Sequence, residues 1–309
     1  MEKRVYGVIG ISSIMANWNA DFSGFPKTTS DGETFGSDKA LKYPMKKMWE
    51  NEGKKVLYIK SMRLSKDRAS LIPRTLKERY EMLFHVENLA GCKDVKEILR
   101  NLMSAVDVKN FGATFAESNN NISITGAVQI GQGFNKYEGT NPEEQQILSP
   151  FRDAKDDKEE ALNSTLGTKI VSNEAHYFYP FVINPATYRE LTELGVTEGY
   201  TEEDYENFRK AALVSATSFA TNAKEGCENE FALFVETDSH IYLPNLSEYI
   251  IFEKAQGKNV IGLEWGEFLK EFGDGIQKID VYYNPYTTVL EGVTDQMKLY
   301  DIRTQKEVG

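Results

Sequence analysis

The 309-residue sequence has few residues of the kinds that build covalent or metal-bound scaffolds, because it contains two cysteines and three histidines. Cys92 and Cys227 lie far apart without a metal-ligand spacing, so we expect neither a disulfide framework nor a zinc ribbon, and both thiols fit a reducing cytoplasm. His85, His176 and His240 are scattered singly, which is more typical of structural or surface histidines than of metal ligands. No metal and no cofactor are expected.

Long apolar runs are also missing. No stretch approaches the roughly 18–20 apolar residues that a membrane span needs, so we expect no membrane partner. The start, MEKRVYGVIGI, has basic residues before a short apolar run, but no small-residue cleavage site follows it. We therefore expect no signal peptide and a cytoplasmic location.

The common catalytic and nucleotide-binding motifs are absent. The sequence contains no GxxxxGK[ST], no GxGxxG between a strand and a helix, no HExxH and no GxSxG. The acidic runs DAKDDKEE and TEEDYE lack the glycine and the terminal glutamate of an EF-hand loop, so a solvated surface is the better interpretation.

Positive charge is scarce overall but is concentrated in one third of the chain. The formal net charge of −11 would argue against a polyanionic partner. Residues 1–100, however, contain 19 Lys and Arg against 13 Asp and Glu, whereas residues 101–309 contain 17 against 34. The chain can therefore present a cationic face although its total charge is negative, and solvated surface charge without a partner is the alternative.

The order of predicted elements indicates an α+β fold. The apolar run 5–16 predicts a central strand buried on both faces, and 17–38 has the composition of a long ordered loop. Asp38 is the expected N-cap of a helix that ends at Gly53, which Pro44 should kink or delay. Further strands are predicted at 54–62, 107–116, 121–131, 165–185, 228–236 and 275–285. Further helices are predicted at 74–91, 94–106, 201–223 and 264–273.

These elements follow the order of a split βαβ, the RRM-like or ferredoxin-like plan. Residues 1–309 would form a single domain with insertions at 61–105 and 131–172. Residues 136–164 carry many charges, and we expect them to protrude from the core as a mobile segment.

Residues 17–47 combine polar side chains, glycines and lysines with four aromatic residues, Trp18, Phe22, Phe25 and Phe35. Lys39, Lys42 and Lys46 are spaced to form one face of the predicted helix. Cations, hydroxyl and amide donors, and rings for base stacking are what a protein needs to hold single-stranded RNA. A packed structural loop whose aromatic residues belong to the core is the alternative.

Four blocks of the sequence follow one another in a recognisable order and cover most of residues 5–236. The blocks are VYGVIGISSIMANWNADFSGFPKTTSDGETFGSDKALKYPMKKMW, VKNFGATFAESNNNISITGAVQIG, NSTLGTKIVSNEAHYFYPFVINP and ATSFATNAKEGCENEFALFVE. They resemble the CRISPR-associated Cas-seven (Cas7) family, most closely the type I-B (Csh-type, DevR-like) backbone subunits of Cascade. The first and third blocks together are specific.

The resemblance implies an RRM-like palm, a helical fingers insertion at 61–105 and a thumb hairpin within 131–172. It further implies a non-catalytic subunit that polymerises head to tail along crRNA in a type I CRISPR interference (Cascade) complex and supports target DNA recognition. The implied partners are crRNA, target DNA through the guide, further copies of the chain and other Cascade subunits.

Residue by residue, the resemblance places RNA contacts on the palm loop, the adjoining helix, the palm surface, the thumb and the turn that closes the groove. These residues are Asn17, Asn19, Lys27, Thr28, Thr29, Ser30, Lys39, Lys42, Lys46, Phe111, Gly112, Gln129, Leu148, Phe151, Leu166, Lys169, Ser218, Thr221 and Asn222. The sequence departs from the family at Ala127, where many relatives have proline, and at ENEFALFVE, where relatives tend to carry arginines. The thumb is also acidic.

Two other functions are compatible with these residues. An RNA endonuclease of the type III backbone kind would use an aspartate in the loop after the first strand, with Asp21 as the candidate and Asp31 second. An assembly protein of the same fold would bind no RNA.

Overall fold

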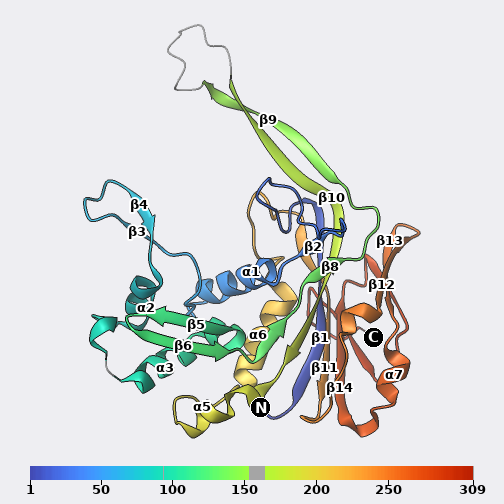
Figure 1. Ribbon diagram of the computed structural model, residues 1–309. Helices are drawn as coiled ribbons and strands as arrows, with labels where there is room; N and C mark the ends of the chain where they lie inside the picture. Colours follow the sequence, from blue (N-terminus) through green and yellow to red (C-terminus); the bar gives the residue numbers. More distant parts are fainter. Residues whose placement is uncertain (93, 153–163, 309) are drawn as a thin grey trace.

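The computed structural model describes residues 1–92, 94–152 and 164–308. Helices and sheets are both present in this part of the chain, which confirms the predicted mixed α and β class (Figure 1). No helix among the described residues is long and apolar enough to cross a membrane.

The main sheet is built around β1 (Arg4–Ala16), which lies between β10 (Ser164–Ile183) and β11 (Cys227–Thr237) and is antiparallel to both. Beyond β11 follow β14 (Ile276–Tyr283) and β16 (Met297–Asp301). On the side of β10 lie β2 (Phe35–Gly36), β7 (Val128–Ile130), β8 (Gly133–Asn135) and β9 (Pro142–Arg152).

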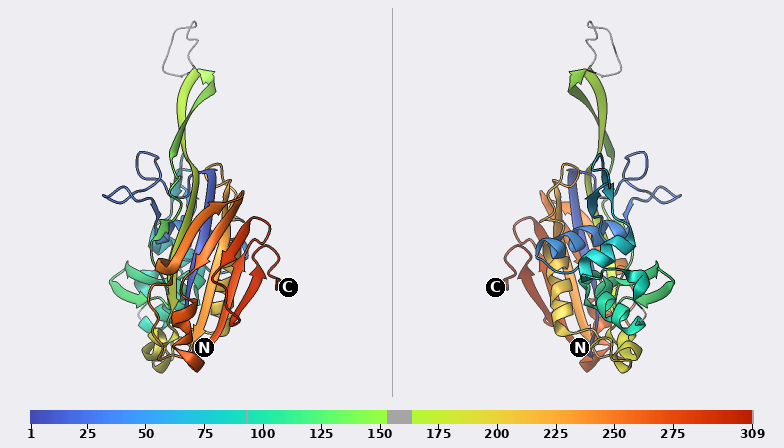
Figure 2. Two further views of the ribbon diagram at one scale, coloured as in Figure 1. Left: turned by 90° about the vertical axis from the view of Figure 1, so that its right-hand side faces the viewer. Right: turned by 90° about the vertical axis from the view of Figure 1, so that its left-hand side faces the viewer.

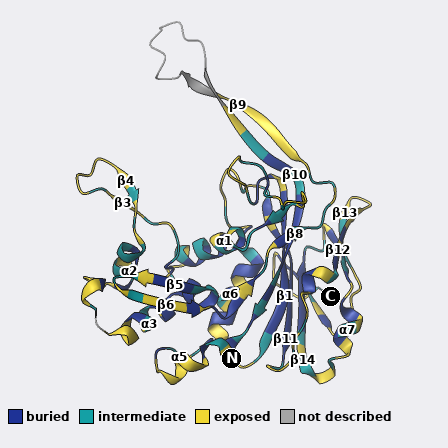
Figure 3. Ribbon diagram, viewed as in Figure 1, coloured by how far each residue is buried: buried dark blue, intermediate teal, exposed yellow. Residues whose placement is uncertain are grey.

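β1 is buried on both faces, as its continuous apolar run predicts (Figure 3). Alternate residues enter different cores, with Val5 and Ile9 in one and Tyr6 and Val8 in the other. Gly7 is required here, because a Cβ at this position would overlap the Phe181 ring and the carbonyl oxygen of the neighbouring strand. The strand therefore fixes the two layers that cover the sheet.

Helices and two small sheets cover one face of the main sheet. The helices are α1 (Asp38–Asn51), α2 (Leu76–Phe84), α3 (Val95–Ser104), α4 (Val106–Phe111), α5 (Arg189–Glu193) and α6 (Glu202–Val214). The small sheets pair β3 (Met62–Leu64) with β4 (Leu71–Pro73), and β5 (Gly112–Glu117) with β6 (Asn120–Thr125). Short 3-10 helices lie at η1 (Leu89–Gly91) and η2 (Pro185–Tyr188).

The C-terminal quarter of the chain covers the other face (Figure 2). Its three-stranded sheet contains β12 (Ile250–Ala255), β13 (Lys258–Leu263) and β15 (Thr288–Glu291). It is completed by η3 (Leu246–Tyr249), α7 (Gly266–Lys270) and η4 (Gly273–Gly275).

The strand predicted at 54–62 is wrong except at Met62, where β3 begins, and the strand predicted at 107–116 is wrong over its first half. Residues 54–61 are not in a strand, because the buried Asp107 carboxylate accepts the backbone N–H groups of Leu57 and Tyr58 at 2.8 Å each, in place of a strand partner. Residues 106–111 form α4, and a strand begins only at Gly112, whose φ of 81° ends the helix.

Two helix ends also differ from the prediction. Ser37, not Asp38, caps α1, because its side chain accepts the N–H of Ala40, and the helix continues through Pro44. The helix predicted at 201–223 ends at Val214, where the Asn229 side chain accepts the next free backbone N–H groups. The segment predicted to protrude forms the β9–β10 hairpin, which projects from the sheet (Figure 1); residues 153–163 lie outside the described residues.

His176 joins the main sheet to the C-terminal quarter. Its buried ring lies between two carboxylates, with Nδ1 2.8 Å from Glu230 and Nε2 3.0 Å from Glu174, and it stacks on Phe252 of β12 at 3.9 Å. Lys254 of β12 also pairs with Glu174, at 2.5 Å. Because both ring nitrogens face carboxylate acceptors, only the charged imidazolium, which has an N–H on each nitrogen, can donate a hydrogen bond to both. Burial lowers the pKa of His176, but the two carboxylates outweigh it and raise the pKa overall.

The His176 site should make stability depend on pH. A raised pKa means that the imidazolium stabilises the fold fully below the unfolded value of about 6.5 and that this contribution is lost as pH rises through the folded pKa. We expect His176→Gln to have a lower thermal midpoint than the wild type at pH 6. At pH 9 the thermal midpoints of the two proteins should lie closer together. The exposed His240→Gln is the matched control, and a pH-independent difference would contradict the prediction.

Candidate nucleic-acid interface

Three segments from distant parts of the sequence meet at one end of the main sheet (Figure 1). We call residues 17–37, 167–173 and 215–226 the loop cluster. The first segment follows β1, the second belongs to β10 where it continues into the hairpin, and the third precedes β11. They meet because β1 pairs with both β10 and β11, with Ala16 opposite Ser172 and Ser13 opposite Cys227.

Asn17 connects the three segments. Its side-chain Nδ2 donates to the carbonyl oxygens of Gly24 at 2.8 Å and of Ile170 at 3.2 Å, and its backbone N–H donates to Ala223 at 3.0 Å. The side chain is buried. Asn17, a predicted RNA contact, therefore has a clear structural role in holding the loop cluster together.

Lys224 secures the same junction from the third segment. Its Nζ donates to the carbonyl oxygens of Asn17, at 2.7 Å, and of Trp18, and it lies over the Trp18 ring. Burial lowers the pKa of Lys224. The sequence analysis did not identify this residue, because one lysine in an acidic segment carries no pattern that distinguishes a buried donor from a surface charge.

Trp18 belongs to the core. Its ring is buried, and its Nε1 donates to the Tyr179 hydroxyl at 2.5 Å. The loop then leaves the core, because the Phe22 side chain is fully exposed, and Phe25 and Phe35 are half-buried. Of the four aromatic residues in this loop, the structure leaves Phe22 best placed to stack on a base.

Short backbone bridges shape the rest of the loop. Ala20 pairs with Pro26 and Thr28 pairs with Thr34. The Asp21 carboxylate accepts the backbone N–H groups of Ser23 and Phe25 at 2.8 and 3.0 Å. Asp21, the candidate of the endonuclease hypothesis, thus closes a turn, and no group of three or more potential metal ligands is found in the part of the chain that the structure describes.

The remaining predicted loop residues divide into anchors and exposed groups. Asn19 accepts the N–H of Ser37 at 2.7 Å, and Thr29 accepts that of Glu33 at 3.1 Å. Thr28 and Ser30 are exposed, and half-buried Lys27 lies over the Phe35 ring with its ammonium 5.4 Å from the ring centroid. This part of the loop therefore offers the ammonium group of Lys27, the hydroxyl groups of Thr28 and Ser30, and the Phe35 ring.

The three lysines of α1 do not form a uniform ladder. Lys39 is exposed, whereas Lys42 pairs with Asp38 at 2.8 Å. Lys46 is largely buried and donates to the Tyr58 carbonyl oxygen at 3.2 Å. Burial lowers the pKa of Lys46, and the nearby Asp107 offsets part of this effect. Lys46 therefore serves the fold, and Lys39 is the accessible cation of the set.

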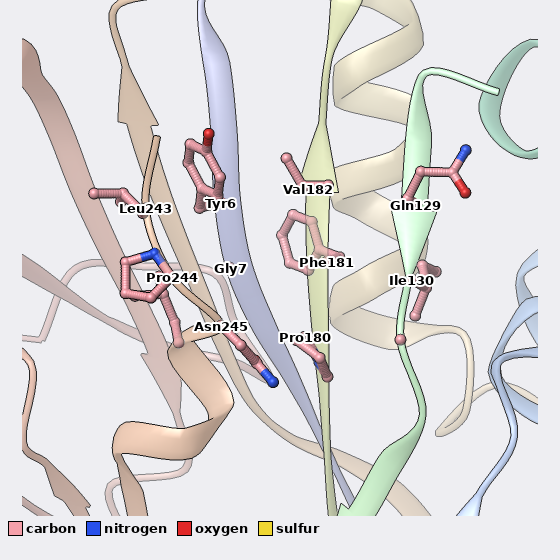
Figure 4. Close-up of a pocket in the computed structure, with 12 residues that line it drawn as sticks. Tyr6, Gly7, Gln129, Ile130, Pro180, Phe181, Val182, Leu243, Pro244 and Asn245 are labelled. Carbon is pink, nitrogen blue, oxygen red and sulfur yellow. The ribbon is translucent and has the colours of Figure 1, made fainter. Parts of the chain in front are cut away.

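Phe111, Gly112 and Gln129 lie away from the loop cluster. Phe111 packs on Trp49 beneath α1, with Lys42 over its ring at 5.1 Å, and Gly112 follows it at the end of α4. Gln129 pairs with Val182, near the opposite end of β10, and lines a separate groove of about 430 Å³ (Figure 4). The structure does not bring Gln129 to the loop cluster.

The last predicted residues lie on the hairpin and on the turn before β11. Leu148 is exposed on β9, and Leu166 faces it in register; the side chains of Phe151 and Leu166 lie outside the described part of the structure. Lys169 Nζ lies 3.4 Å from Asn222 Oδ1, which links the hairpin base to the turn. Ser218 and Thr221 are exposed on the same turn.

Comparisons with known proteins agree with this architecture. Residues 3–264 match the sequence model of a protein family that is described as CRISPR-associated protein Cas7. A chain of the solved "CRISPR RNA-guided surveillance complex, pre-nicking" is similar with a TM-score of 0.54 at 15% identity over 96% of each chain. A chain of a "CRISPR RNA-guided surveillance complex" has a TM-score of 0.49 and 16% sequence identity, over 95% of this chain and 94% of that one. No curated protein matches the chain.

Removing the Lys224 ammonium should loosen the loop cluster. Because two carbonyl oxygens lose a charged donor, we expect Lys224→Met to reduce the free energy of unfolding by about 1.5–3 kcal/mol and to expose residues 17–37 to proteases. Urea denaturation and limited proteolysis measure both effects, with Lys298→Met on an exposed position of β16 as the control. Unchanged stability together with unchanged proteolysis would contradict this role.

Proposed function

The chain belongs to the CRISPR-associated protein Cas7 family, and from this premise we propose that it is a non-catalytic subunit that binds crRNA across the loop cluster. The observation that carries the proposal is the meeting of three segments at one end of the sheet. They bring together the half-buried cations Lys27 and Lys169, several exposed hydroxyl groups and the exposed Phe22 ring. Cations and hydroxyl groups bind the phosphates of RNA, and its bases stack on aromatic rings.

Most of the predicted contacts either touch RNA directly or position the groups that do under this proposal. Gln129 lies on a separate groove, and Leu148, Phe151 and Leu166 remain proposed contacts of the hairpin. Direct contacts with RNA come from the exposed or half-buried members of the loop cluster and from the start of α1. These are Lys27, Thr28, Ser30, Lys39, Lys169, Ser218, Thr221 and Asn222. Asn17, Asn19, Thr29, Lys42 and Lys46 position the loop and α1. Phe111 packs on Trp49 of α1, and Gly112 follows it at the end of α4.

The finer description follows the resemblance to type I-B backbone subunits of Cascade. β1 between two antiparallel strands, with α1 after it and α6 before β11, supports an RRM-like palm. Residues 61–105 would be the fingers and 131–172 the thumb of a single domain. Copies would assemble head to tail on crRNA with other Cascade subunits in the cytoplasm and support recognition of target DNA.

Neutralising three lysines of the interface, exposed Lys39 and half-buried Lys27 and Lys169, tests this function. We expect the triple variant Lys27→Gln, Lys39→Gln, Lys169→Gln to bind single-stranded RNA more weakly. The slope of log affinity against log salt should fall by about 2, because each phosphate contact contributes about 0.7. Fluorescence anisotropy from 50 to 300 mM salt, about the range over which phosphate contacts are resolved, measures both quantities.

The control carries three glutamines at exposed lysines of the C-terminal quarter, Lys270, Lys298 and Lys306. An equal loss in both triple variants would indicate a nonspecific effect of net charge and would contradict the site. A protein purified from its host without RNA and indifferent to crRNA would support the RNA-free assembly hypothesis. Cleavage of a guide-complementary RNA that Asp21→Asn abolishes would support the endonuclease.

A further inference from the structure

The β3–β4 ribbon exposes an entirely apolar face. Met62 lies opposite Pro73 and Leu64 lies opposite Leu71, so the four side chains share one face of the two strands. Leu64 is 56% exposed and Leu71 is 63% exposed. A two-stranded ribbon is marginally stable alone in water, and an exposed apolar face of this kind usually marks an interaction site.

Positive charge surrounds this face. Lys60, Lys66 and Arg68 are exposed around the ribbon. The one acidic residue of segment 60–74 is Asp67, and its carboxylate accepts hydrogen bonds from Ser65 and Ala69 within the turn. The ribbon therefore presents an apolar centre with a cationic rim.

The C-terminal sheet exposes a face of opposite character. Its outward side chains form two rows across the three strands, Ile251–Gly262–Glu291 and Glu253–Val260–Val289. A groove of about 280 Å³ on this face is lined by Glu264 as well as by Glu253 and Glu291. Lys258 lies at the far end of the same face. The face therefore combines apolar side chains with three carboxylates against one ammonium.

The two surfaces lie on opposite sides of the molecule. Figure 1 shows β3 and β4 on the left and β12 and β13 on the right, and the two views of Figure 2 show that each is on a separate side. They cannot meet within one chain. A contact between them would join different surfaces of two copies and would leave a free surface at each end, which is how open polymers grow.

We propose that the β3–β4 ribbon of one copy packs on the outer face of the β12–β13–β15 sheet of the next. Met62, Leu64 and Leu71 cover the apolar centre, and Lys66 and Arg68 approach Glu253 and Glu291. This assignment rests on the proposed function, because it names the surfaces through which copies assembled on RNA touch. The contact is small, so RNA that holds two copies adjacent would strengthen it by raising their effective concentration.

Disulfide trapping tests the contact directly. In a Cys92→Ser background, one chain carries Leu64→Cys, another carries Val289→Cys, and a third carries both. Under mild oxidation, with and without a long single-stranded RNA, we expect dimers when the two single variants are mixed and a ladder of multimers from the chain with both. Neither single variant alone should form more dimer than Lys298→Cys.

Charge exchange adds a rescue. Lys66→Glu with Arg68→Glu should reduce the ladder by about tenfold or more, because like charges are then juxtaposed, and Glu253→Lys with Glu291→Lys in the same chain should restore it. A ladder no stronger than the Lys298→Cys control, in both conditions, would overturn the proposal. So would a ribbon double variant that loses affinity for an RNA too short for two copies, because the ribbon would then contact RNA. If the protein binds RNA but forms no ladder, the contact between copies is contradicted and the proposed function is not. If it forms a ladder but does not bind RNA, the proposed function is contradicted and the contact is not.

Discussion

The pairing of β1 with both β10 and β11 is the constraint on which the rest of the structure depends. Because β1 is apolar on both faces, it must be covered by a layer on each side, and its antiparallel neighbours bring two distant segments to the end where its own loop begins. The loop cluster is thus a consequence of strand order. The helical layer, the hairpin and the C-terminal sheet are all placed relative to these three strands.

Polar residues in the loop cluster serve two purposes. Asn17, Asn19, Asp21 and Lys224 use their hydrogen bonds to hold the loop, whereas other polar side chains of the cluster, such as Thr28, Ser30 and Thr221, are exposed. A loop anchored in this way is ordered in the free protein, so under the proposed function it would reduce the entropy that RNA binding must overcome. It also means that many substitutions in this loop will act through folding.

The sequence was sufficient to predict β1, the long loop after it, and the strands that begin near 165 and 228. It also predicted both ends of α1 to within about two residues. These follow from local apolar patterns and turn residues. It could not predict that Asp107 replaces a strand partner for residues 57 and 58, or that Asn229 ends α6, because both depend on contacts between distant segments. For the same reason Lys46 and Lys224 were indistinguishable from surface lysines, and the distance of Gln129 from the loop followed only from strand register.

Photo-cross-linking of bound RNA tests the central claim most directly. RNA that contains 4-thiouridine would be bound to the purified protein, cross-linked, and mapped by mass spectrometry of the attached peptides. The account predicts that the attached peptides come from residues 17–37, 167–173 and 215–226. Cross-links confined to the C-terminal sheet, or absent from all three segments, would contradict it.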